Sequence, residues 1–558
     1  MRYKIALVLC SLLFTWYAVN ADDNFGTNDD QLYKINKSFD MFGAVFKQIS
    51  NNYVIEIDPE QLVLDGINGM LESLDPYTTY MDEYDTEDID LLTYGSYVGL
   101  GITVSNIDSM LTIYRIRDGF SADNNGLRPG DRIYKVDGDT LLYSNTNELR
   151  KYTRGKPGST LELTYIRDGI NDTVTVSLPR EEIIVDNISY YGMVSDSVGY
   201  IKLERFSRLS AKEMKDAISD MKSNNPLASI ILDLRDNPGG LLESAVSVCE
   251  LFVDDSSSIV TTKSRFAGGE KTYKSKVKPV AADLNLAVLI NSNSASASEI
   301  VAGAIQDLDR GIILGERSFG KGLVQSVFNL PYNTSLKMTT SRYFTPSGRS
   351  IHRIKYDPKR RNFNKAEFPD DSSHVFYTKN GRPVYESKGI TPDSILTDTS
   401  YPEYINQLSY DNLFFSFGTI YSSRLNDLPN KFKVNDQILH QFKKYIESKG
   451  FQYESKLTKE VKILEDAAKE EGLGENVIEQ IKKLSDEINK FSNDAFDKHK
   501  DDIKRILYME IASRFFSERQ LVKEYIDDDS IMKVAIQLLQ PNSYKHLLTN
   551  TKKDNGKN

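Results

Sequence analysis

The sequence predicts a multidomain α/β chain with helical regions at both ends. Between residues 184 and 352, short apolar runs such as 286–290 alternate with segments of helical periodicity. Residues 94–180 carry glycine-marked turns and alternating strands, which is typical of a small β-rich domain. Residues 434–550 are rich in Lys and Glu and again show helical periodicity. A chain of 558 residues has room for roughly three or four domains.

These patterns divide the chain into five parts. We expect a signal peptide at 1–21, an N-terminal helical region at 22–93, a β-rich domain at 94–182, a core at 183–400 and a C-terminal helical region at 401–558. Residues 355–387 are polar and basic at first, and we interpret them as an insertion into the core whose role the sequence leaves open.

The N-terminus has the pattern of a secretory signal. Arg2 and Lys4 precede an apolar stretch at 5–14, and small residues follow up to Ala21. The stretch is short for a membrane span. The mature chain would keep Cys249 alone, so an intrachain disulfide is excluded. We therefore expect export to a bacterial periplasm or cell envelope, with membrane association left open. A net charge of −11 argues against nucleic acid as a partner.

The segment from residue 289 to residue 325 carries the residues of chemical interest. Ser296 follows an apolar strand and begins a helical pattern, so it lies near unpaired N–H groups that favour developing negative charge. Lys321 stands between two glycines, and Gln325 follows four residues later. A serine becomes a nucleophile when a base takes its proton, and a lysine serves if burial keeps its amine neutral near pH 7. If residues 320–325 are extended, residues 321, 323 and 325 share one face.

Three other interpretations compete at this point. Ser296 and Glu299 also form a capping box, which is a structural device. An isolated Lys321 would normally be a solvated surface residue. Ser318 and Lys321 match the S-x-x-K pattern of penicillin-recognising enzymes, but the partner motifs S-D-N and K-T-G do not occur in this chain.

The wider motif set resembles the carboxy-terminal processing peptidases, also called tail-specific proteases. The S-A-S-A-S-E run around Ser296 and the F-G-K-G segment around Lys321 match that family closely. The D-L-R-x-N-x-G-G motif that starts at Asp233 matches it too. An L-D-P-H-S-x-Y signature is matched at residues 74–80, but Tyr77 and Thr78 depart from it. The resemblance covers roughly residues 35 to 400.

The resemblance implies specific roles and a crotonase-like (ClpP/crotonase) serine protease core. Ser296 would be the nucleophile, Lys321 the general base, and Gln325 the residue that orients the lysine. The oxyanion hole would use the N–H of Ala297 and one N–H from Gly239 or Gly240, which follow a buried strand. Without the other motifs, these glycines would be an ordinary turn. Asp233 and Arg235 are expected to pair and hold that turn.

The sequence contains few residues that could support catalysis by a histidine base or by a metal ion. Of 5 His, His352 is the one close to the core motifs, and it is the alternative candidate for the base. No H-E-x-x-H motif or cysteine pair is present, so we expect no metal and no cofactor.

The β-rich region resembles a PDZ domain of the protease-associated type. The segment Gly99-Leu100-Gly101-Ile102 matches its carboxylate-binding loop. Backbone N–H groups there can receive a peptide's C-terminal carboxylate, and an edge strand can add the peptide as a further strand. The simpler interpretation is a β domain without a ligand.

Together these observations predict an exported serine endopeptidase that cleaves protein or peptide substrates with free C-termini. The alternative is a catalytically silent PDZ scaffold that presents substrates to another protease. The sequence leaves open the physiological substrate, the oligomeric state and any adaptor or activator protein.

Overall fold

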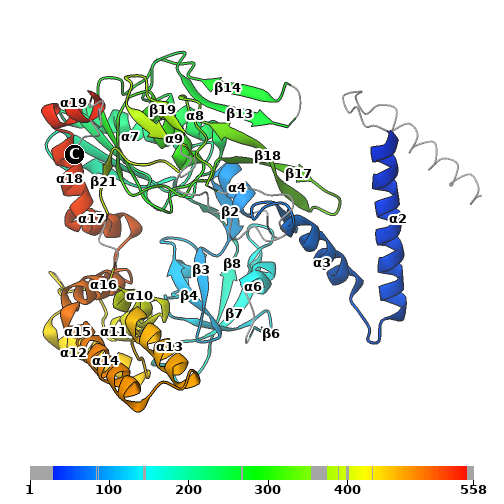
Figure 1. Cartoon of the computed structure of the whole chain (residues 1–558), viewed down its shortest axis with the longest axis vertical. Coiled ribbons are helices and arrows are strands. Elements are labelled where there is room, and N and C mark those ends of the chain that lie inside the picture. The colour runs from blue at the N-terminus through cyan, green and yellow to red at the C-terminus, as the bar shows by residue number, and fades with distance from the viewer. Residues whose placement is uncertain are drawn as a thin grey trace, which may run out of the picture. The chain divides into compact units, whose positions relative to one another are not determined.

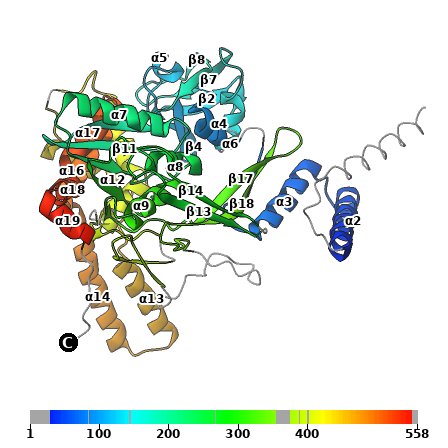
Figure 2. The same ribbon diagram turned by 90° about the horizontal axis from the view of Figure 1, so that it is seen from above.

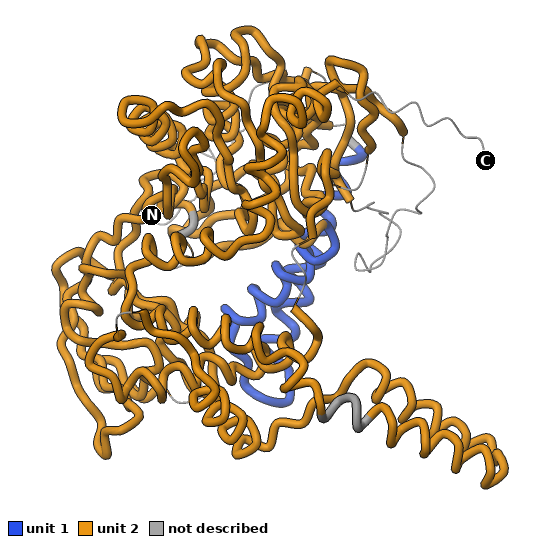
Figure 3. The backbone as a smooth tube through the Cα atoms, turned by 90° about the vertical axis from the view of Figure 1, so that its left-hand side faces the viewer, with its two compact units in different colours: residues 1–74 blue, residues 75–558 orange. Residues whose placement is uncertain are grey.

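The computed structural model describes residues 29–549, apart from 83–84, 86, 142–145, 266–267, 354–373, 387–388, 398–400 and 430. The expected signal peptide and most of the expected 355–387 insertion therefore lie outside the described residues. The chain divides into two compact units, residues 1–74 and 75–558 (Figure 3).

The first unit contains two described helices, α2 (Asp29–Asn52) and α3 (Pro59–Glu72). The α3 helix begins with Pro59 directly after Asp58, whose carboxylate accepts a hydrogen bond from the Glu60 N–H. This is a standard N-terminal cap. Within the described residues, no helix is long and apolar enough to cross a membrane.

The centre of the second unit is a six-stranded sheet. Its order is β10 (Ile188–Met193), β11 (Val198–Leu203), β12 (Ser229–Asp233), β15 (Asn285–Ile290), β16 (Ile312–Gly315) and β21 (Ser394–Ile395). The β10–β11 pair is antiparallel and the other neighbours are parallel. The predicted strand at 286–290 is thus a buried inner strand.

The two faces of this sheet are covered by different parts of the chain (Figure 1). Alternate strand residues such as Ile230 and Val288 face α7 (Ser210–Asn224), α8 (Leu242–Cys249) and α9 (Ala297–Asp307). The residues between them, such as Ile231 and Leu289, face α17 (Glu518–Asp528), α18 (Ser530–Leu538) and α19 (Pro541–Thr549). This period of two explains why the inner strands carry continuous apolar runs, 230–232 in β12 and 286–290 in β15.

A second sheet brings the 75–81 segment to the core. Its order is β1 (Thr79–Met81), β18 (Ser335–Phe344), β13 (Ser258–Ser264) and β14 (Glu270–Lys274), and β17 (Leu323–Asn329) also pairs with β18. A short hairpin, β19 (Val375–Tyr377) and β20 (Pro383–Tyr385), lies within the expected insertion.

The β-rich region forms its own sheet over a separate apolar core. The order is β3 (Ile102–Ile107), β4 (Met110–Ile116), β5 (Arg132–Val136), β7 (Thr160–Ile166) and β8 (Val174–Pro179), and the short β6 (Asp139–Thr140) pairs with β5. Two other strands, β2 (Ser96–Gly99) and β9 (Glu181–Ile184), pair beside it. Helix α6 (Thr146–Thr153) contacts β3, which is an outer strand of the described sheet.

The C-terminal region is helical, as predicted. A cluster of aromatic and aliphatic side chains joins α10 (Glu403–Tyr410), α11 (Leu413–Ser422), α12 (Asp436–Ser448) and α16 (Lys500–Ala512). Helices α13 (Lys456–Glu470) and α14 (Glu475–Asn493) form a hairpin that is seen most easily from above (Figure 2). The expected fold class is therefore present as a mixed α/β protein with a β-rich domain and helical ends. The crotonase-like class of the core stays a prediction.

Candidate active site

Ser296 occupies the sharp turn between β15 and α9. It is the N-cap of α9, as the sequence predicts, with φ 56° and ψ −112°. A positive φ is unfavourable for a residue with a Cβ, and such strain is found at functional turns that present a side chain. The Tyr343 hydroxyl donates to the Ser296 carbonyl oxygen at 3.1 Å, which helps to hold this conformation. The turn therefore presents a half-buried serine at a helix N-terminus.

The Glu299 carboxylate joins this turn to the Lys321 loop. It accepts hydrogen bonds from the N–H of Ser296 at 2.9 Å, of Lys321 at 2.9 Å and of Gly320 at 2.7 Å. The Ser318 hydroxyl also donates to it at 2.5 Å. Burial raises the pKa of the Glu299 carboxyl, and these hydrogen bonds oppose that rise. Sequence reasoning assigned Glu299 to a capping box alone, so this second role was missed.

Lys321 lies in the loop that leads into β17, and its amine is largely withdrawn from water. Burial, followed by the charge of Lys337, lowers the pKa of Lys321 to about 8, while Glu299 and Asp75 oppose the shift. The Nζ atom lies over the ring of Tyr77, at 4.5 Å from its centroid. Within the described residues, no hydrogen bond joins Lys321 Nζ to Ser296 Oγ. The expected base and nucleophile thus share the Glu299 carboxylate as a backbone anchor.

The strand that carries Gln325 begins later than the sequence predicts. Strand β17 begins at Leu323, so Lys321 precedes the strand, and alternation along the strand does not place it. The ladder also shifts register between Val324 and Gln325. Gln325 Nε2 donates to Thr339 Oγ1 at 3.4 Å. The orientation of Lys321 by Gln325 therefore stays a prediction.

The glycine pair lies directly against the serine turn. A Cβ on Gly239 would come within 2.7 Å of the Ala295 carbonyl oxygen and 2.9 Å of the Ala297 nitrogen, so a larger residue does not fit. Gly239 has φ 106° and Gly240 has φ 148°, values that favour glycine. The Gly239 N–H donates to Asn237 Oδ1 at 2.9 Å. The turn that carries Gly239 therefore touches the first residue of α9.

The Asp233–Arg235 pair is present, as predicted, and it has a third partner. Arg235 Nη2 donates to Asp233 Oδ2 at 2.6 Å and to Asp529 Oδ2 at 2.6 Å. Burial alone would raise the pKa of Asp233, but Arg235 holds it well below its usual range. Asp529 lies 294 residues further along the chain, and no sequence signal pointed to it.

The alternative site residues have structural partners. His352 is buried and its Nδ1 accepts a hydrogen bond from the Gly322 N–H at 3.2 Å. Burial and the charge of Arg342 lower the pKa of His352 to about 4. Ser318 is buried between Glu299 and the Ile390 N–H, which donates to its hydroxyl at 2.6 Å. This arrangement favours a supporting role for Ser318.

The expected carboxylate-binding loop lies at the start of β3. Gly99 pairs with Glu181 at the end of β2, and Leu100 is buried. The Leu100 carbonyl accepts from the Ala122 N–H at 3.0 Å and the Gly101 carbonyl from the Arg117 N–H at 2.8 Å. In a trans peptide the N–H points opposite to the preceding carbonyl. The N–H groups of Gly101 and Ile102 therefore point away from Ala122 and Arg117.

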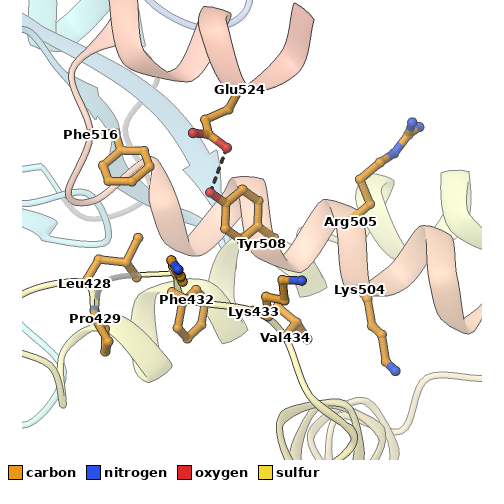
Figure 4. A pocket seen from close by; sticks show the side chains of 11 residues that line it. Leu428, Pro429, Phe432, Lys433, Val434, Lys504, Arg505, Tyr508, Phe516 and Glu524 are labelled. Atoms are coloured by element: carbon orange, nitrogen blue, oxygen red, sulfur yellow. Dashed lines mark hydrogen bonds between the residues drawn. The ribbon is translucent and has the colours of Figure 1, made fainter. Parts of the chain in front are cut away.

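Elsewhere in the described structure there is a pocket but no cluster that could bind a metal. In the part of the chain that the structure describes, no group of three or more His, Cys, Asp or Glu side chains could hold a metal. A pocket lies among the C-terminal helices, where the Tyr508 hydroxyl donates to Glu524 Oε2 at 2.9 Å (Figure 4). Its lining contains none of the predicted site residues.

Comparison with known proteins assigns this chain to a family. The family model "Peptidase family S41" matches residues 197–360, and "PDZ domain" matches 98–178. The carboxy-terminal-processing protease of Bartonella bacilliformis is 37% identical over 335 residues, which are 60% of this chain and 76% of that protein. The chain belongs to the carboxy-terminal processing protease family. Its β-rich region is a PDZ domain.

Other matches extend along the rest of the protease. "Probable PDZ-protease, C-terminal helical domain" matches residues 404–539, and "Activating protease CtpB N-terminal domain" matches 14–85. Carboxy-terminal processing protease CtpA of Bacillus subtilis is 33% identical over 333 residues, 60% of this chain and 70% of that protein. Among solved structures, the photosystem II D1 C-terminal processing protease is 24% identical with a TM-score of 0.35, covering 63% of this chain and 85% of that one.

Proposed function

We propose that this protease is an exported serine endopeptidase that uses Ser296 as nucleophile and Lys321 as general base. The observation that carries the proposal is the Glu299 carboxylate, which binds the backbone N–H of both residues. One buried group thereby fixes the distance between the strained serine turn and a lysine whose pKa is lowered to about 8. The crotonase-like class of the core belongs to the same proposal, supported by the parallel strands and the three helices on one face.

The proposed reaction begins with a proton transfer. Neutral Lys321 takes the Ser296 proton after its side chain turns from Tyr77 toward the serine, as catalytic contacts often tighten on substrate binding. Ser296 Oγ attacks the scissile carbonyl, the peptide C–N bond breaks, and protonated Lys321 returns the proton to the leaving amine. Water then hydrolyses the acyl-enzyme with Lys321 again as base.

The oxyanion needs two backbone donors in this scheme. The Ala297 N–H is the first N–H of α9, where the helix dipole favours negative charge. Because the Gly239 N–H already donates to Asn237, we assign the second donor to the Gly240 N–H. Gly239 then serves by its small size, since a Cβ there would meet Ser296 Cβ at 2.9 Å.

The PDZ domain supplies the substrate class in this proposal. The N–H groups of Gly101 and Ile102 point away from Ala122 and Arg117 at the start of the outer strand β3, which suits a free C-terminal carboxylate and a peptide added as a strand. Export and a periplasmic or envelope location are part of the proposal, on the pattern of residues 1–21.

Purified protein tests the proposal against the silent scaffold. Ser296→Ala should abolish cleavage of a tailed protein substrate without lowering the melting temperature, because one hydroxyl is lost. Ser219→Ala is the matched control, since its hydroxyl binds the Lys215 carbonyl on the exposed side of α7. Equal cleavage by Ser296→Ala and wild type would reject the nucleophile, and a wild-type protein that binds tails without cleaving them would favour the scaffold.

A further inference from the structure

The C-terminal helices are built into the protease core. Side chains of α17, α18 and α19 cover one face of the six-stranded sheet, including Ile531, Met532 and Ala535. The Tyr544 hydroxyl of α19 accepts from the Leu286 N–H at 3.0 Å, and Leu286 belongs to the strand that leads to Ser296. The last helices of the chain are therefore part of the core that carries the site.

Asp529 stands at the junction between α17 and α18. Its Oδ1 caps α18 by accepting the N–H of Ile531 at 2.8 Å. Its Oδ2 accepts from Arg235 Nη2 at 2.6 Å. The side chains of Asp529 and Arg235 are only 1% and 6% exposed, so water does not substitute for either partner.

The charges around Arg235 balance only when Asp529 is counted. Asp233 Oδ2 accepts from Arg235 and from the Tyr200 hydroxyl, at 2.6 and 2.7 Å. Lys202 Nζ lies 3.6 Å from Asp233 Oδ1 and also donates to the Arg235 carbonyl. Two cations thus face two carboxylates in a buried cluster. Without Asp529, the cluster would carry an uncompensated positive charge, which is costly in the interior.

The residues after Arg235 connect this cluster to the reacting groups. The Asp236 N–H donates to Asn291 Oδ1 at 2.9 Å. The Asn237 carbonyl accepts from the Ala295 N–H at 3.1 Å and from the Ser298 hydroxyl at 2.9 Å. These hydrogen bonds join the turn from Arg235 to Gly240 to residues that precede and follow Ser296. A shift of Arg235 would move the glycine turn against the serine turn.

We propose that Asp529 is a positioning residue for the acyl-transfer reaction: it holds Arg235, and with it the glycine turn that faces Ser296. The inference rests on the proposed function, because it assigns the turn to the oxyanion. Since the oxyanion exists in the transition state and not in the bound substrate, loss of Asp529 should lower kcat with little effect on KM.

Asp529→Asn is the sharpest test, because asparagine keeps the shape and the capping oxygen and removes the charge. We expect kcat on a short unmodified peptide to fall roughly tenfold or more, because a displaced oxyanion donor stabilises the transition state less. KM should stay within about twofold of the wild-type value. The affinity of a peptide boronic acid, whose tetrahedral adduct uses the same donors, should fall by the same factor as kcat/KM. Asp529→Glu, which restores the charge, should recover part of the loss.

Asp528→Asn is the matched control, since Asp528 is exposed and lies 3.5 Å from Arg505. It should leave kcat and boronic acid affinity unchanged. In one outcome, Asp529→Asn lowers the melting temperature and still leaves kcat and boronic acid affinity unchanged when both are measured well below that temperature. This outcome would show a folding role and overturn the proposal.

If Asp529→Asn does not fold, Arg235→Lys is the second variant, since it keeps a cation and loses the double hydrogen bond. The same loss of kcat at constant KM is expected. Failure of both variants to fold would reject the positioning role in favour of a folding role. The proposed function is tested separately, by turnover in wild type that is lost in Ser296→Ala. If Asp529→Asn keeps wild-type kcat, the positioning role is rejected and the proposed function still stands.

Discussion

The amine of Lys321 lies over the ring of Tyr77, 4.5 Å from the ring centroid. Tyr77 occupies the position where the family signature has histidine. The ring excludes water from one side of the amine, and burial is the main cause of the lowered lysine pKa. The cation–π attraction acts in the opposite direction, since it stabilises the protonated amine.

Peptidase activity should therefore follow deprotonation of Lys321. We expect kcat/KM to rise with pH and to level off above about 8, because the neutral amine is the active form. Lys321→Arg should be inactive at every pH, since arginine stays charged. A pH–rate profile from pH 6 to 10 on a short peptide measures both. A profile that is flat over this range would contradict a lysine base.

Tyr77 should tune that profile through its ring. In Tyr77→Ala the amine gains water and loses the cation–π attraction. Because burial is the main cause of the lowered pKa, we expect the gain of water to dominate, so the apparent pKa should rise and activity at pH 7 should fall. In Tyr77→Phe the ring remains and the shift should be small. The comparison uses the same pH–rate measurement, and similar profiles for the alanine variant and wild type would rule out this role.

Glu299 should be needed for both stability and turnover. Glu299→Gln keeps the size, but its amide has one acceptor oxygen for the four donors seen in the structure. We expect a loss of roughly 2–4 kcal/mol in the free energy of unfolding and at least a tenfold lower kcat. Ser318→Ala removes one of the four hydrogen bonds and should cost about 1 kcal/mol.

Denaturant unfolding and steady-state kinetics on the same samples separate the two effects of Glu299. A variant that loses stability and keeps wild-type kcat well below its unfolding transition would reduce Glu299 to a helix cap.

Gly239 should tolerate no side chain. In Gly239→Ala the new Cβ would lie 2.9 Å from Ser296 Cβ, so the serine turn must move, and kcat should fall at least about 100-fold. Gly138→Ala is the control, because Gly138 also has a positive φ but faces open space. It should cost about 1 kcal/mol of stability and leave kcat intact. A nearly active Gly239→Ala enzyme would contradict the tight contact.

The PDZ domain should distinguish free from amidated C-termini. A substrate with a free C-terminal carboxylate should be cleaved faster than its amide, because the N–H groups of Gly101 and Ile102 favour an anion. In Gly101→Ala, whose Cβ would meet Phe120 Cβ at 2.9 Å, that difference should disappear. Gly119→Ala, with the same φ of 78° in open space, should retain it. Equal cleavage of acid and amide by wild type would refute tail recognition.

The sequence by itself determined the motifs of this protein and the local conformation of each. The motifs around Ser296, Lys321 and Asp233 are local in the chain, and each predicts a local conformation: a helix start, a glycine-flanked loop and a strand that ends in a glycine turn. The helix that starts after Ser296, the buried strand before it and the Asp233–Arg235 pair are present in the structure as predicted. Local sequence was sufficient for these features because residues close in the chain decide them.

The tertiary structure decided which distant groups complete the site. The sequence indicates a helix cap at Glu299. Its contacts with the Lys321 loop arise only when the chain after β16 returns beside the start of α9. Tyr77 reaches Lys321 because β1 pairs with β18, and Asp529 reaches Arg235 because α17 and α18 cover the sheet. Periodicity reports which face of a segment is buried but not against which partner. Buried charges such as Arg235 need partners from anywhere in the chain, and folding alone brings those partners together.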